Sequence, residues 1–158
     1  MSTPQRLTRE EQEAFVREAI ETADGLRREK RHKEAISLLV EGLQYGIEKA
    51  NLYYRLGNVY IDGSDLARAE YAYKRALEID PKHVNAMHNL AVVYKRQNKI
   101  SQYVKTYKKS QRMALRYPKS LNLSRGDKRR IRFLSGRILV WIVGGFGLVV
   151  LLIWLFGR

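Results

Sequence analysis

The chain has 158 residues, enough for one compact domain with an appended segment and too few for two large domains. It contains no cysteine, which excludes disulfide bonds, thiol nucleophiles and thiolate metal sites. Its formal net charge is +14, yet residues 1–104 hold 17 basic against 15 acidic side chains, whereas residues 105–137 hold 12 against one. The sequence therefore predicts a nearly balanced domain followed by a strongly basic segment.

Helix signals begin near the N-terminus. Residues 1–13 contain several acids and no apolar core, so we expect no secretory or transit peptide there. Thr8 and Glu11 have the spacing of a capping box, in which each side chain bonds the backbone N–H of the other residue. Asp62-Gly63-Ser64 and Asp80-Pro81 are typical of helix ends. The sequence predicts helices over residues 9–29, 34–47, 51–62, 65–79, 84–97, 100–116 and 125–156.

An internal repeat with a fixed period runs through the domain. Windows 16–49, 50–83 and 84–117 have equal lengths and align without gaps. Small residues recur at one position and large residues at another: Ala23, Gly57 and Ala91, then Leu39, Tyr73 and Tyr107. Antiparallel helices approach closely where one presents a small residue and the other fills the space. Because such a unit cannot bury its apolar face alone, we expect the units to stack.

The middle window carries a characteristic set of residues: Tyr53, Leu56, Gly57, Tyr60, Ala69, Tyr73, Ala76 and Pro81. This set resembles the tetratricopeptide repeat (TPR) family, which places aromatic, Leu-Gly, Tyr, Ala, aromatic, Ala and Pro residues at those positions. The outer windows match the family pattern more loosely. The resemblance implies an all-α domain over residues 1–117, in which three helix-turn-helix repeats form a short right-handed solenoid that binds a protein partner.

In a stack of helix pairs, the first helix of each pair is expected to line the concave side. Asn58 and Asn89 fall on that side, and each amide can bond the backbone of an extended peptide with both of its ends. Tyr54 can cover an apolar side chain, while Arg55 and Lys95 can attract carboxylates. The predicted partner-binding residues are Tyr54, Arg55, Asn58, His88, Asn89 and Lys95. The alternative is an ordinary solvated helix face.

Residues suited to catalysis or metal binding form no recognisable set. The three histidines, His32, His83 and His88, have no metal-ligand spacing with one another or with a carboxylate on the same face. No nucleophile–base set, Gly-rich phosphate loop or pair of catalytic carboxylates can be assembled. We therefore expect no enzyme activity, no cofactor and no metal site.

Residues 118–137 form a predicted basic linker that leads into the next helix. Five of its side chains are expected to lie at a membrane surface, each contributing on the order of 1 kcal/mol through anionic headgroups: Lys128, Arg129, Arg130, Arg132 and Arg137. Binding to RNA is the alternative, because Tyr103, Tyr107 and Tyr117 are interleaved with the basic residues that begin at Lys105. These rings also fit the repeat core, which favours the membrane.

Residues 138–156 are an uncharged and largely apolar run. As a helix they extend roughly 28 Å, close to the hydrocarbon thickness of a bilayer. Trp141 and Trp154 lie near the two ends, where indoles favour the membrane interface. Three mid-span glycines permit another membrane helix to approach, although ordinary tolerance of glycine explains them equally well: Gly144, Gly145 and Gly147. The sequence predicts a single transmembrane helix, with burial of this run in a complex as the alternative.

Function follows from this arrangement as a hypothesis. The basic flank places the N-terminal domain in the cytoplasm by the positive-inside rule, which is strongest for a bacterial inner membrane. We expect a single-pass, membrane-anchored TPR scaffold that serves as an accessory or assembly subunit of a membrane protein complex. Two alternatives are a tail-anchored recruitment factor of the mitochondrial outer membrane, which would resemble the fission receptor, and a membrane-associated RNA-binding protein.

Overall fold

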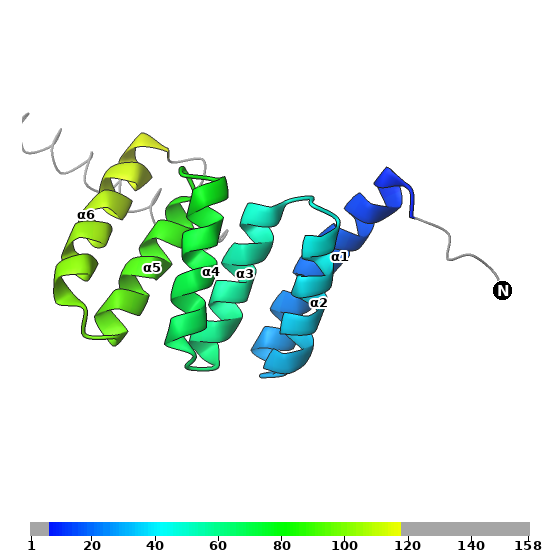
Figure 1. Ribbon diagram of the computed structural model, residues 1–158, viewed down its shortest axis with the longest axis horizontal. Helices are drawn as coiled ribbons and strands as arrows, with labels where there is room; N and C mark the ends of the chain where they lie inside the picture. Colours follow the sequence, from blue (N-terminus) through cyan, green and yellow to red (C-terminus); the bar gives the residue numbers. More distant parts are fainter. Residues whose placement is uncertain (1–6, 118–158) are drawn as a thin grey trace, which may run out of the picture. The chain divides into compact units, whose positions relative to one another are not determined.

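The computed structural model of the chain describes residues 7–117, and within them the secondary structure is entirely helical. The helices are α1 (Arg9–Arg28), α2 (His32–Gln44), α3 (Lys49–Asp62), α4 (Leu66–Ile79), α5 (Val84–Arg96) and α6 (Ile100–Arg116). They follow one another from α1 to α6 (Figure 1), and each packs against the next. Because α3 also contacts both α1 and α5, the helices form a stack of three pairs.

The six predicted helices that fall within residues 7–117 are confirmed to within a few residues, and so is the all-α class over that range. The N-terminal capping box is confirmed as well. The Thr8 hydroxyl accepts a hydrogen bond from the backbone N–H of Glu11 at 3.3 Å, and the Glu11 carboxylate accepts one from the backbone N–H of Thr8 at 2.7 Å. Two otherwise unpaired donors of the first helical turn are thereby satisfied.

The turn inside each helix pair has one conformation, repeated three times. Lys30, Ser64 and Asn98 have positive φ angles of 62°, 62° and 59°. In the middle turn, the N–H of Asp65 donates to the carbonyl of Tyr60 at 2.9 Å, which is the long hydrogen bond of a Schellman motif. The three left-handed residues follow one another at the repeat interval that the sequence predicts.

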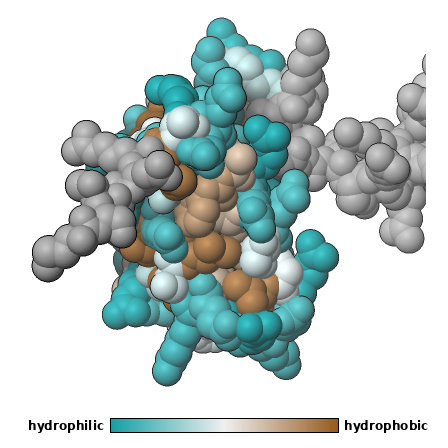
Figure 2. Space-filling view, turned by 90° about the vertical axis from the view of Figure 1, so that its right-hand side faces the viewer, coloured by the Kyte–Doolittle hydropathy of each residue, from teal (hydrophilic) through white to brown (hydrophobic). Residues whose placement is uncertain are grey.

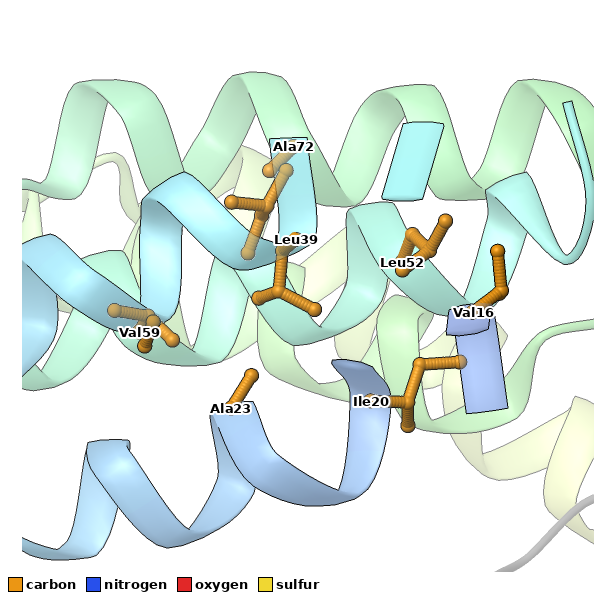
Figure 3. Packing of buried hydrophobic residues seen from close by; sticks show 9 residues of the cluster. Val16, Ile20, Ala23, Leu39, Leu52, Val59 and Ala72 are labelled. Atoms are coloured by element: carbon orange, nitrogen blue, oxygen red, sulfur yellow. The ribbon is translucent and has the colours of Figure 1, made fainter. Parts of the chain in front are cut away.

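The core begins between α1, α2 and α3 and continues along the stack. In the first cluster, Val16, Leu39 and Leu52 are fully buried and face one another across three helices (Figure 3). A second cluster lies farther along, where Tyr73 and Val93 are also fully buried. Burying one such side chain contributes about 1.5–3 kcal/mol to folding. Stability therefore comes from contacts between pairs as well as from those within them.

The predicted pairing of small with large residues holds in the first two pairs and fails in the third. In the second pair, a Cβ atom added to Gly57 would lie 2.5 Å from Cε1 of Tyr73, so the ring packs directly on the glycine backbone. Tyr73 is completely buried, but its counterpart Tyr107 is 38% exposed. Ala91 carries a Cβ where Gly57 has none, and the Tyr107 ring lies beside that of Tyr103, with 5.6 Å between the ring centroids.

Apolar side chains are also present at the other end of the described stack. Figure 2 shows them gathered on the end that carries α1 and α2, with hydrophilic residues around them. Val40 of α2 is 45% exposed, and Leu7, just before α1, is 41% exposed. A repeat stack exposes apolar surface where its terminal unit has no neighbour.

Within residues 7–117, no helix combines the length and the apolar character needed to cross a membrane. The predicted transmembrane helix over residues 138–156, with its interfacial tryptophans and mid-span glycines, lies outside the described residues. So does the predicted basic linker over residues 118–137.

Candidate partner-binding surface

The structure brings four of the six predicted partner-binding residues together, and an amide pair lies at their centre. Asn89 on α5 donates from Nδ2 to Oδ1 of Asn58 on α3 at 2.9 Å, and the Tyr73 hydroxyl donates to the same oxygen at 2.7 Å. Burial raises the pKa of Tyr73, which keeps this hydroxyl protonated. One end of each amide is thus held in place inside the domain.

The other ends of the two amides remain available. Among residues 7–117, no hydrogen bond satisfies Nδ2 of Asn58 or Oδ1 of Asn89, and both side chains are half-buried. A free donor on α3 and a free acceptor on α5 therefore belong to two side chains that bond each other. This arrangement can bond the C=O and N–H of an extended peptide backbone. Only one end of each amide is free to form such bonds, whereas the sequence suggested that both ends would bind the peptide.

Arg55 is positioned by an ion pair within the domain. Its guanidinium bonds the carboxylate of Asp24 on α1, and the two side chains are 21% and 18% exposed. Arg27 extends the same network, 2.7 Å from Asp62 and 3.9 Å from Asp24. The predicted role of Arg55 in attracting ligand carboxylates thus competes with a neighbour that already balances its charge.

Tyr54 closes the side of this surface nearest the start of α5. Its ring centroid lies 4.7 Å from that of His83 and 6.1 Å from that of Tyr73. His83 caps α5 by accepting a hydrogen bond at Nδ1 from the backbone N–H of Ala86 at 3.2 Å. Burial lowers the pKa of His83, so the ring is neutral and can accept this bond at physiological pH. Tyr54 remains half-buried, with part of its ring open to a ligand.

His88 and Lys95 lie elsewhere on α5, beside α6. The His88 ring centroid is 6.2 Å from that of Tyr107, and Lys95 Nζ is 5.9 Å from the centroid of Tyr103. Both side chains are exposed. They border the surface of Tyr54, Asn58 and Asn89 without sharing its hydrogen bonds.

Sequence reasoning missed the contacts that connect one helix pair to the next. Asp24 and Arg55 join α1 to α3, and Asn58 and Asn89 join α3 to α5, each across 31 residues. We call the contact between the first and second helix pairs the first junction. The contact between the second and third pairs is the second junction. Both pairs have the same separation in sequence, which is shorter than the repeat period by about one helical turn. This shared separation is the signal in the sequence that could have indicated the contacts.

Metal binding has no support from the described residues. Within residues 7–117, no group of three or more histidine, aspartate or glutamate side chains could hold a metal ion. The expectation that the chain is not an enzyme stays a prediction.

Comparison with known proteins agrees with the helical architecture. Residues 57–98 match the family model of the TPR repeat. The matched segment runs from the end of α3 through α5 and includes Asn58, Tyr73 and Asn89. The chain is also similar to the uncharacterized protein ycf37 of Pyropia yezoensis, with 35% identity over 86 residues. That alignment covers 54% of this chain and 43% of the relative, so the chain spans less than half of the relative's length. The TPR repeat is therefore supported where the amide pair lies.

Proposed function

We propose that this chain is a TPR scaffold that holds a partner protein at a membrane, as an accessory or assembly subunit of a membrane protein complex. One observation carries the binding part of this proposal: the donor of Asn58 and the acceptor of Asn89 have no partner among residues 7–117, although the two side chains bond each other. They lie in the segment that matches the TPR repeat, a module that typically binds proteins.

The ligand that best suits this surface is an extended segment of a partner protein. Its backbone would bond the free ends of Asn58 and Asn89, and an apolar side chain would pack on Tyr54. The exposed Lys95 supplies a positive charge at the border of the surface. Since the surface offers backbone recognition and a single aromatic contact, we propose binding without catalysis.

The membrane part of the proposal rests on sequence alone. Residues 138–156 have the length and composition of a membrane span, and basic residues precede them. We propose a cytoplasmic repeat domain, with the bacterial inner membrane favoured over the mitochondrial outer membrane. Confinement to a membrane raises the effective concentration of the scaffold for a membrane partner without any additional contact.

Membrane anchoring is tested by removing residues 138–158 and separating membranes from the soluble fraction. The full-length chain should sediment with membranes and resist extraction by high salt, whereas the truncated chain should remain in solution. A truncated chain that still sediments would contradict the proposed anchor. Release of the full-length chain by salt alone would point to a peripheral or nucleic-acid association instead.

Partner binding is tested by purifying the full-length chain in a mild detergent and identifying the proteins that accompany it. A membrane protein in a fixed ratio to the scaffold is expected, and Tyr54→Ala with Lys95→Glu should reduce its amount. Lys33→Glu, an exposed change on α2, is the matched control. Arg55 is a poor choice for this test because its replacement also breaks the pair with Asp24. Equal recovery with all variants would exclude this surface.

A further inference from the structure

A cleft lies between α4, α5 and α6, away from the surface described above. Its volume is about 330 Å³, and its floor consists of Leu77, Met87 and Leu90. Met87 and Asn89 are two positions apart on α5, and successive residues turn by roughly 100°, so their side chains leave opposite sides of that helix. A ligand in this cleft would therefore not compete with one bound at Asn58 and Asn89.

The cleft lies at the second junction. At the equivalent place in the first junction, one repeat earlier, Tyr53 stands where Met87 stands, and Arg75 where Lys109 stands. The guanidinium of Arg75 lies 5.8 Å from the ring centroid of Tyr53, so aromatic and cationic groups of the chain itself pack there. At the second junction the slender thioether of Met87 replaces the ring, and space remains open beside it.

The edge of the cleft is positively charged. Lys74, Lys105 and Lys109 all line it. Lys74 is engaged by Glu70 at 2.6 Å, whereas no ion pair within residues 7–117 involves Lys105 or Lys109. Helix α6 as a whole carries five basic residues and no acidic one. Glu78 is the single acidic residue at the cleft, and it is paired with Arg75.

We propose that this cleft is a second binding site, which takes an acidic segment of a partner protein and inserts one large apolar side chain of that segment between α4 and α6. The apolar floor contacts the inserted side chain, and carboxylates on either side of it bond the ammonium groups of Lys105 and Lys109. A volume near the lower limit for ligand sites suits one anchoring side chain. A flat layer of lipid headgroups would meet the lysines but leave the floor of the cleft unfilled.

The probe is a set of acetylated pentapeptides, Asp-Glu-X-Glu-Asp, in which X is Leu, Phe, Met or Trp, with Ala at X as the reference. The full-length chain, kept in an uncharged detergent and labelled at its methionine methyl groups, is titrated and observed by NMR. Peptides with a large X should shift the Met87 methyl signal at about 1 mM, the affinity expected of one anchor residue with weak ion pairs, and the Ala peptide should not. Absence of a shift with every large X overturns the proposal.

Variants show whether the cleft itself binds the peptide. Lys105→Gln with Lys109→Gln should weaken binding about tenfold, whereas Lys108→Gln with Arg112→Gln removes the same charge from α6 outside the lining and should change affinity less than about twofold. Equal losses of peptide affinity in the two double variants would mean that the peptide is attracted by the overall charge of α6, which would overturn the proposed site. Met87→Tyr copies the first junction and should abolish binding; if it impairs folding, the exposed lysine pair still decides.

A short-chain lipid separates the protein ligand from a membrane. Dihexanoyl-phosphatidylglycerol is titrated in the same way, with dihexanoyl-phosphatidylcholine as the uncharged reference. The proposal predicts that neither lipid displaces the acidic pentapeptides. If the anionic lipid shifts the Met87 methyl signal and the peptides do not, the cleft is a lipid site and the proposal is wrong. Tyr54→Ala should leave peptide binding unchanged, which distinguishes this site from the proposed partner-binding surface.

Discussion

The two junctions of the stack use one geometry with different chemistry. Asp24 and Arg55 join the first pair to the second, whereas Asn58 and Asn89 join the second to the third, each across 31 residues. An ion pair balances its own charge, but an amide pair that forms one bond leaves a donor and an acceptor unused. The cleft beside Met87 also belongs to the second junction. The charges of the first junction are therefore balanced within the domain, whereas the second junction keeps hydrogen-bonding groups free, which is why we propose recognition there.

The largest effect is expected from Gly57→Ala, which disturbs the second junction through Tyr73. The added Cβ would lie 2.5 Å from a ring carbon of a fully buried side chain whose hydroxyl holds Asn58. We expect a loss of about 3 kcal/mol in unfolding free energy, at the upper end of the range for overpacked cores. Chemical denaturation measures it. Gly25→Ala, where a Cβ meets no atom within 4 Å, is the control and should stabilise α1 by about 0.5–1 kcal/mol.

A second substitution tests the reason for this loss. Gly57→Ala combined with Tyr73→Leu reproduces the Ala23 and Leu39 pair of the first repeat, which packs without exposed surface. The double variant should be more stable than Gly57→Ala alone, because leucine leaves room for the added methyl group. The gain is reduced by loss of the hydrogen bond from the Tyr73 hydroxyl to Asn58. If the losses of unfolding free energy in Gly57→Ala and Tyr73→Leu simply add in the double variant, Gly57 is not required to make room for the Tyr73 ring.

The second largest loss of stability is expected from breaking the ion pair of the first junction. Arg55→Asn leaves the carboxylate of Asp24, which is 18% exposed, with only the distant contact to Arg27 at 3.9 Å. We expect a loss of about 2 kcal/mol, between the values for exposed and buried pairs. Adding Asp24→Asn converts the first junction to an amide pair like the second and should restore much of the stability. Added salt should reduce the stability of the wild-type chain more than that of the Asn/Asn variant, which keeps the other ion pairs of the domain.

Acid should weaken the contact of Glu70 on α4 with Lys99, which precedes α6, at 2.8 Å. Partial burial alone would raise the pKa of Glu70, but hydrogen bonds from Lys74, Lys99 and Gln97 outweigh it and lower the pKa to about 2. Between pH 4.5 and about 2, Glu70 is protonated in the unfolded chain but still charged in the folded one. Its contribution to the unfolding free energy is therefore complete above pH 4.5 and is lost as the pH falls to about 2. In the first pair, the apolar Ile36 occupies the equivalent position.

The loss from Glu70 should amount to about 1–2 kcal/mol by pH 2, measured by denaturation at a series of pH values. Glu70→Gln should flatten this part of the pH profile. Hydrogen exchange gives the local readout: Glu70→Gln should reduce the acid-dependent loss of protection where α4 meets α5 and α6. An unchanged acid-dependent loss in Glu70→Gln would mean that this carboxylate does not stabilise the contact.

Much of the fold could be predicted from sequence because its determinants are local and periodic. Thr8 with Glu11, the break at Asp62–Ser64 and the spacing of small residues each depend on neighbours within one repeat. What sequence reasoning missed depends on contacts between repeats. The pairing of Arg55 with Asp24 requires knowing which helices touch, and the repeat pattern places Tyr107 where Tyr73 is completely buried although Tyr107 is 38% exposed.

The smallest effect concerns the turns, where the three repeats share a backbone but not a residue. Lys30, Ser64 and Asn98 all adopt positive φ, which costs an L-residue roughly 1–2 kcal/mol, less for asparagine. Ser64→Gly and Lys30→Gly should therefore each raise the unfolding free energy by about 0.5–1 kcal/mol, partly offset by the greater freedom of glycine in the unfolded chain, and Asn98→Gly should raise it least. Thermal denaturation of the three variants gives the ranking. Equal gains at all three positions would show that the asparagine brings no advantage, and a loss at Ser64 would mean that its hydroxyl contributes more than the strain costs.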